Sequence, residues 1–209
     1  MKIKATGLLN RNSVKIFSII GSNKNVIALT MFSIIGICIG VLCETINSDV
    51  YSTISVLYDD YLLNINNISF LKIFLKCSAY NSIFIMLSMI FGMCAVGNVF
   101  LYVVPFIKGL GIGAACAYIY STYAIKGVLY SAVIIFPAAL IQLISIILSC
   151  SESVHMSKEI LSLIEHKENE NAEPDTRLYI LRYLVIFGFI FLSGLIYSGC
   201  VMIFSSIIY

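Results

Sequence analysis

Side chains that could do chemistry are few in this sequence, and they form no familiar catalytic or ligand pattern. The two histidines, His155 and His166, are eleven residues apart, and the seven cysteines include no Cys-x-x-Cys pair. We interpret the cysteines as small apolar packing residues and the histidines as solvated. The His-Glu-x-x-His, Gly-x-Ser-x-Gly and P-loop patterns are also missing from the sequence. We therefore expect no catalytic residue, no metal site, no cofactor and no enzymatic activity.

Charges inside the membrane would be another sign of chemistry, because an ionised side chain at the bilayer centre costs at least about 2.5–3.5 kcal/mol. The long uncharged runs leave Lys108 and Lys126 at their boundaries and contain no ionisable residue themselves. This pattern argues against an intramembrane protease, a proton-coupled pump and a subunit with its own nucleotide site. Amide side chains remain, which either bond neighbouring helices or line the path of a passive permease. The intramembrane polar residues are predicted to be Asn81, Asn98 and Gln142.

The elements that must position these residues are transmembrane helices. Hydrophobic residues make up 60% of the 209 and charged residues only 11%, whereas soluble proteins have about 25% charged residues. A helix needs about 20 apolar residues to cross the hydrocarbon core. We predict an all-α integral membrane protein, with a basic N-terminal segment at 1–24 and one five-helix membrane domain at 25–209. The spans are placed near 26–44, 81–104, 109–125, 128–150 and 183–207.

The distribution of Lys and Arg predicts the orientation of these spans. The N-terminal segment carries five, the turn at Lys108 one and residues 151–182 four, whereas the opposite side carries three. We expect a cytoplasmic N-terminus, an extracytoplasmic C-terminus, a cytoplasmic loop at 151–182 and an acidic external loop at 45–70. The basic residues flank spans, so no nucleic-acid partner is expected. A candidate partner-binding surface in the external loop consists of Asp49, Asp59 and Asp60.

Lys108 is predicted to mark the turn between the second and third spans, at the cytoplasmic face. The glycines that follow it would let the third span pack closely against a neighbour, and Gly36 and Gly40 form a G-x-x-x-G match in the first span. Pro137 predicts a kink in the fourth span, because proline lacks the N–H that the helix requires. The predicted helix-packing positions are Gly36, Gly40, Gly92, Gly97, Gly109 and Gly113.

The segment from Ile90 to Tyr120, with the Gly-Val-Leu-Tyr run that follows at 127–130, resembles the core of the stage II sporulation protein M family. The shared pattern is a glycine pair in one span, a Lys-Gly turn, a glycine four residues later, and a Gly-x-Leu start to a span that contains proline. The matching positions are Asn81, Gly92, Gly97, Lys108, Gly109, Gly113, Gly127 and Pro137. The chain departs from the family at Ala138, Ala139 and Ile144, where Gln-Asn and a second proline are common.

The resemblance implies a polytopic scaffold in endospore formation, located in the cell membrane at the sporulation septum, that recruits a pair of cell-wall hydrolases during engulfment. Its partners would be the lipid bilayer and membrane or extracytoplasmic proteins, and a homo-oligomer is a further expectation. The alternative is a permease-like subunit of a small-solute transporter that works with a separate ATPase. In that interpretation Asn81, Asn98 and Gln142 line the path near the Pro137 kink, and residues 157–166 dock the ATPase.

Overall fold

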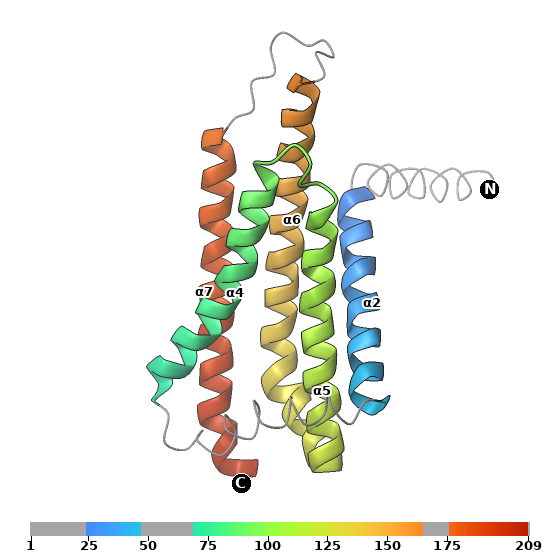
Figure 1. Cartoon of the computed structure of the whole chain (residues 1–209). Coiled ribbons are helices and arrows are strands. Elements are labelled where there is room, and N and C mark those ends of the chain that lie inside the picture. The colour runs from blue at the N-terminus through green and yellow to red at the C-terminus, as the bar shows by residue number, and fades with distance from the viewer. Residues whose placement is uncertain (1–23, 47–68, 165–175, 209) are drawn as a thin grey trace, which may run out of the picture.

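The chain folds as a bundle of long helices (Figure 1). The computed structural model describes residues 24–46, 69–164 and 176–208, and these ranges contain no strand. The elements in chain order are α2 (Lys24–Ile46), α4 (Phe70–Gly92), the 3-10 turn η2 (Phe100–Tyr102), α5 (Val103–Tyr130), the π-helical segment η3 (Ser131–Ile135), α6 (Phe136–Ile164) and α7 (Thr176–Ile208). The all-α prediction is therefore confirmed.

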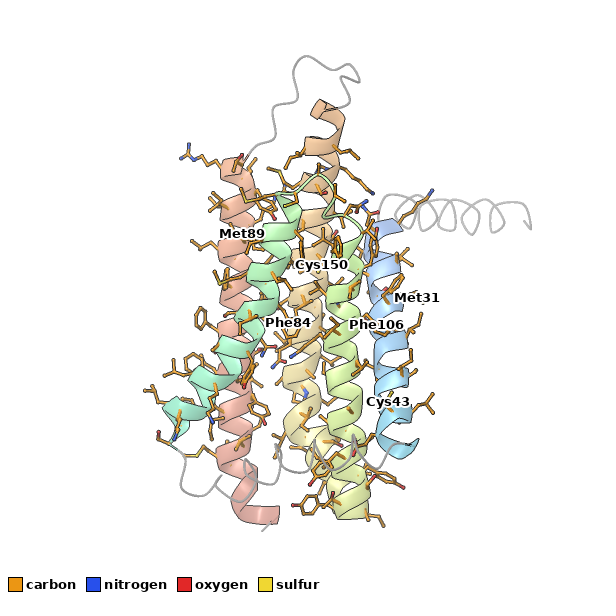
Figure 2. All side chains as sticks on the ribbon, viewed as in Figure 1. Met31, Cys43, Phe84, Met89, Phe106 and Cys150 are labelled. Atoms are coloured by element: carbon orange, nitrogen blue, oxygen red, sulfur yellow. The ribbon has the colours of Figure 1, made fainter. Side chains whose placement is uncertain are left out.

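Five helices of the described ranges are long and apolar enough to cross a membrane, as predicted. Their candidate spans are Lys24–Glu44, Phe70–Gly92, Phe100–Ile125, Gly127–Leu161 and Thr176–Ile203. Large apolar side chains such as Met31, Leu71 and Leu184 are exposed, and Figure 2 shows Met31 on the outside of the bundle. A surface of this kind suits lipid as its solvent. The chain is thus a multi-pass membrane protein, and its orientation stays a prediction.

The helices form two packing units. In the first, α2 lies along α5 at one edge of the bundle; in the second, α4, α6 and α7 contact one another. Helix α6, a member of the second unit, also contacts α2 and α5 and so joins the two units. The start of α2, the link between α4 and α5, and the end of α6 lie at one end of the bundle, whereas the C-terminus lies at the other (Figure 1).

The link between the second and third helices lies at residues 93–99, so the prediction of a turn at Lys108 and of a span at 81–104 is wrong. Helix α4 begins at Phe70, ends at Gly92 and is followed by short turns in which Gly97 N donates to Cys94 O at 3.0 Å. A Cβ on Gly97 would lie 1.8 Å from the carbonyl oxygen of Phe91, so only glycine fits this link. The link contains no charge, which is why a search for charged boundaries passes over it.

The turn from α5 into α6 also differs from the prediction. The backbone reverses at Ala124, which has φ 48° and ψ −124°, a conformation that favours glycine. The π-helical segment η3 follows, and Pro137 is the second residue of α6. Pro137 therefore stands where π geometry gives way to α geometry near the start of the span, and produces no kink in its middle. Helix α6 continues to Ile164, so the first part of the predicted loop at 151–182 is helical.

Candidate functional site

Lys108 lies inside α5, eight residues after Phe100, which is about 12 Å along the helix axis. Its Nζ donates to Oδ1 of Asn81 on α4 at 2.7 Å and lies 5.6 Å from the ring centroid of Phe84. The expectation that no ionisable residue lies within a span is thus wrong for this lysine. A charged group at this depth is retained mainly where it serves a function, so Lys108 is the first candidate for one.

Two further side chains complete a small polar group around Lys108. Asn81 Nδ2 donates to the carbonyl oxygen of Cys77 at 2.8 Å, which turns its Oδ1 toward the lysine. Gln142 on α6 approaches the same cysteine, with Nε2 3.5 Å from Sγ. The group therefore draws on α4, α5 and α6, and we call Cys77, Asn81, Lys108 and Gln142 the polar layer.

The polar layer is bounded along the bundle by two apolar clusters. The first, which we call the Tyr118 cluster, consists of Ile73, Tyr118, Ile119, Ile134 and Val201. The second, the Ile146 cluster, consists of Leu29, Val104, Ile146, Ile147 and Cys150, with Phe84 packed against it. Along α5, Val104 of the Ile146 cluster comes first, Lys108 of the polar layer next and Tyr118 of the Tyr118 cluster last. Along α4, and along η3 and α6, the order is reversed: the Tyr118 cluster comes first, the polar layer next and the Ile146 cluster last. Hydrophobic side chains therefore close the layer off toward both ends of the bundle.

Sequence reasoning missed the depth of Lys108 because it treated every charge as the end of a span. One signal was available: the run at 109–125 has only 17 residues, short of the length that crosses a bilayer. Extending that run back to Phe100 gives a helix of full length and places Lys108 inside it. The predicted polar residues Asn81 and Gln142 do come together, whereas Asn98 lies in the 93–99 link, away from both.

Four of the predicted packing glycines lie where α2 and α5 touch. A Cβ on Gly36 or Gly40 would lie 2.3 or 2.2 Å from the carbonyl oxygens of Phe106 and Leu110. From the other side, a Cβ on Gly109 would lie 2.3 Å from Ser33 O, and one on Gly113 would lie 2.2 Å from Ile37 O. Two small-residue motifs therefore interlock and bring the two backbones into contact.

The other two predicted packing glycines have different surroundings. Gly97 belongs to the 93–99 link, as described above, and Gly92 ends α4 beneath the side chains of Tyr179 and Ser153. A Cβ on Gly92 would lie 2.4 Å from the Tyr179 hydroxyl oxygen. The candidate loop residues Asp49, Asp59 and Asp60 lie outside the described residues.

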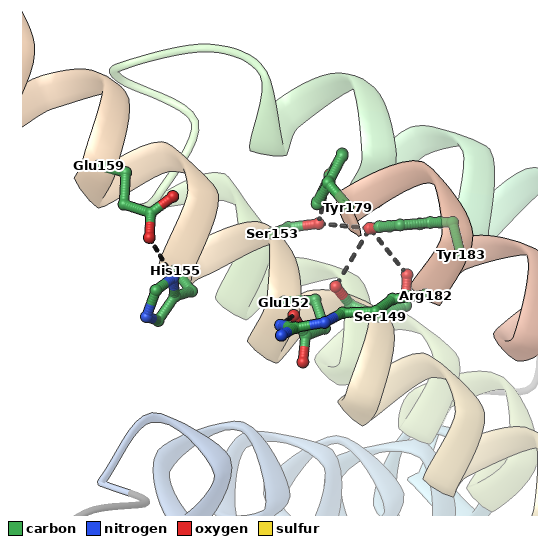
Figure 3. A network of polar contacts seen from close by, with 8 residues as sticks. All are labelled: Ser149, Glu152, Ser153, His155, Glu159, Tyr179, Arg182 and Tyr183. Atoms are coloured by element: carbon green, nitrogen blue, oxygen red, sulfur yellow. Dashed lines mark hydrogen bonds and ion pairs between the residues drawn. The ribbon is translucent and has the colours of Figure 1, made fainter. Parts of the chain in front are cut away.

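A network of buried hydroxyl groups joins α4, α6 and α7, and Figure 3 shows its α6 and α7 members. The Tyr183 hydroxyl on α7 donates to the backbone oxygen of Ser149 at 3.1 Å and contacts the hydroxyls of Ser88, Ser149 and Ser153. Ser153 Oγ donates to Ser88 O at 2.8 Å, and Tyr179 OH donates to Met89 O at 3.1 Å. Buried polar groups that are satisfied in this way fix the relative positions of three helices.

The hydroxyl network went unrecognised in the sequence although its spacing is regular. Ser145, Ser149, Ser153 and Ser157 recur every four residues, so they share one face of α6. Ser157 Oγ donates to Cys94 O at 2.8 Å and so fastens the α4–α5 link to α6. A repeat of small hydroxyl residues on one face is the signal that would have predicted this contact.

The Tyr183→Phe variant should lose stability by about 1–3 kcal/mol, because several buried partners lose one hydroxyl at once. The expected result is a lower midpoint in thermal unfolding of the purified protein, measured by fluorescence-detected size exclusion. Tyr120→Phe is the matched control, since Tyr120 is 61% exposed and lies outside the hydroxyl network. Equal midpoints for the two variants would show that the network contributes no net stability.

Charged residues gather along the second half of α6, beside and beyond the hydroxyl network. Arg182 pairs with Glu152, and His155 Nδ1 lies 3.0 Å from Glu159 Oε1 (Figure 3). Lys158 Nζ donates to Asn25 Oδ1 at 3.1 Å, which joins the end of α6 to the start of α2. Within the part of the chain that the structure covers, no three His, Cys, Asp or Glu side chains cluster as a metal site would require.

Comparison with known proteins identifies the family. The family model described as Stage II sporulation protein M matches residues 26–201, that is 176 of the 209 residues. No curated protein and no solved structure matched the chain. The matched region covers the five candidate spans except for two residues at the start of the first and two at the end of the last, and it contains the interlocked glycines, the polar layer and the hydroxyl network. The chain therefore belongs to the stage II sporulation protein M family.

Proposed function

We propose that this protein is a non-enzymatic membrane scaffold in endospore formation, which anchors cell-wall hydrolases at the septum during engulfment. Family membership supports a sporulation-related membrane protein. The observation that supports a scaffold is the close packing of the helices: the backbones of α2 and α5 touch at four glycines, and buried hydroxyl groups link α4, α6 and α7 by hydrogen bonds. An anchor needs helix ends that keep their spacing, and such contacts provide it.

The proposed orientation keeps the N-terminus in the cytoplasm. With Lys108 inside a span, the N-terminal segment and residues 151–182 carry nine Lys and Arg, against three on the other side, at Lys72, Lys76 and Lys126. The bond between Lys158 and Asn25 supports a common side for the start of α2 and the end of α6. In this orientation the acidic loop at 45–70 faces the cell wall.

The test is a pull-down of the full chain from native membranes of sporulating cells. We expect septal wall hydrolases to be recovered with the unmodified protein and lost with the Asp59→Asn/Asp60→Asn double variant. A matched charge change on the opposite side, Glu159→Gln, should leave recovery unchanged. Failure of the unmodified protein to recover any wall hydrolase would contradict the scaffold proposal.

The second candidate function is a permease-like subunit that works with a separate ATPase. The observation that favours it is the polar layer, since amide and ammonium groups at mid-span are typical of a solute site. In that case the same pull-down should recover a nucleotide-binding subunit, and recovery should fall with changes at the end of α6, such as Glu159→Gln. The scaffold therefore predicts that the loop variant lowers the recovery of its partner and the α6 variant does not. The permease predicts that the α6 variant lowers the recovery of its partner.

A further inference from the structure

We propose that the polar layer binds a small monovalent anion, such as chloride or formate, beside the Lys108 ammonium group. This inference does not depend on the scaffold function, because it concerns a property of the isolated protein. It follows from the charge of the layer, from its surplus of hydrogen-bond donors and from its position between the two apolar clusters.

The first argument is charge. A lysine ammonium has three N–H donors, and among the described residues only Asn81 Oδ1 accepts one of them. The Phe84 ring adds an electrostatic contact on one side. The ion pairs Arg182–Glu152 and His155–Glu159 lie along the second half of α6 and involve other cations. A cation at this depth calls for a negative partner, because hydrocarbon solvates it poorly.

The second argument is the surplus of donors around that cation. Asn81 directs its oxygen to Lys108 and its amide nitrogen to Cys77, so one of the two lone pairs on its oxygen is already in use. Gln142 directs its amide nitrogen to the Cys77 sulfur at 3.5 Å, and a thiol sulfur is a weak acceptor. Lys108, Asn81 and Gln142 together carry seven N–H donors, whereas the acceptors of the layer are the two amide oxygens, with two lone pairs each, and the weakly accepting sulfur, so donors are in excess. An anion, which only accepts, is the complementary ligand.

The third argument is position, which decides the size of the ligand. The Tyr118 cluster and the Ile146 cluster close the layer off along the bundle, so a phospholipid headgroup, which stays at the membrane surface, does not reach it. Lys108 itself is only partly buried, and its remaining surface can be contacted by a small species. These conditions favour a compact anion over a bulky one such as gluconate.

The experiment uses the full chain purified in detergent or nanodiscs, with chloride, formate or gluconate at constant ionic strength. A ligand that binds only the folded state raises its stability with the logarithm of ligand concentration. For a chain of this size we expect the thermal midpoint to rise by about 3–6 °C for each tenfold increase in chloride concentration above the dissociation constant. Chloride-35 line broadening should report the same binding directly. Gluconate should produce neither effect.

Two variants test whether the polar layer is the site. Lys108→Gln removes the charge, and Asn81→Asp places a carboxylate against the ammonium, so both should abolish the chloride effect and the line broadening. Lys158→Gln, which neutralises a lysine at the end of α6, should keep both. No chloride effect in the unmodified protein overturns the proposal, as does a chloride effect that persists in Asn81→Asp. In a further outcome, chloride has no effect and a membrane protein with an acidic residue in its span copurifies tightly with this chain. That outcome would overturn the proposal and identify the copurified protein as the negative partner of Lys108.

Discussion

Gly109→Ala should destabilise the protein by about 1–3 kcal/mol or more, although alanine favours helix formation over glycine. The added Cβ would lie 2.3 Å from the backbone oxygen of Ser33, which belongs to another helix and cannot rotate away. The α2 backbone would have to move, and the contacts of Gly36, Gly40 and Gly113 would be loosened with it. The Gly109→Leu/Gly113→Leu double variant should fail to accumulate in the membrane.

The same helix supplies the control for this prediction. Gly111 has no atom within 4 Å of the position that a Cβ would take, and it is exposed. Gly111→Ala should therefore be neutral or slightly stabilising, by up to about 1 kcal/mol, from helix propensity alone. Membrane accumulation and thermal midpoint measure both variants. Equal behaviour of Gly109→Ala and Gly111→Ala would contradict the backbone contact between α2 and α5.

Asn81→Leu should lower the free energy of unfolding by about 3–5 kcal/mol, because it leaves the Lys108 ammonium in the bundle without its hydrogen-bond acceptor. Removing both members of a buried polar pair costs far less than removing one. The double variant Asn81→Leu/Lys108→Met should therefore recover stability to within about 1 kcal/mol of the original protein. The double-mutant cycle measures the coupling between the two side chains.

Ser145→Ala is the control for the cycle. Ser145 is buried on α6, three residues after Gln142, but its hydroxyl donates to the carbonyl oxygen of Ile141 in its own helix. Its removal should cost less than about 1 kcal/mol and should show no coupling to Lys108→Met. Additive effects of Asn81→Leu and Lys108→Met would mean that the observed bond contributes nothing to stability.

Composition and runs of apolar residues determined the class of this protein. Any segment of about 20 apolar residues must satisfy its backbone internally when it lies in lipid, so five apolar runs predict five helices. The family could also be predicted from the sequence, because its glycine pattern between Gly92 and Gly127 is local. The family match confirmed this prediction. Scaffold function, partners and orientation stay predictions, since they depend on molecules outside this chain.

Only the tertiary structure decided how these elements meet. The sequence shows two G-x-x-x-G spacings, at Gly36 and at Gly109, but which helix each one faces depends on packing across seventy residues of chain. The depth of Lys108 was decided in the same way: the uncharged link at 93–99 reverses the chain because Gly97 permits it, and α5 can then begin early enough to carry the lysine inward to Asn81. Periodicity and charge report local structure, whereas the partner of a buried polar group is set by the fold.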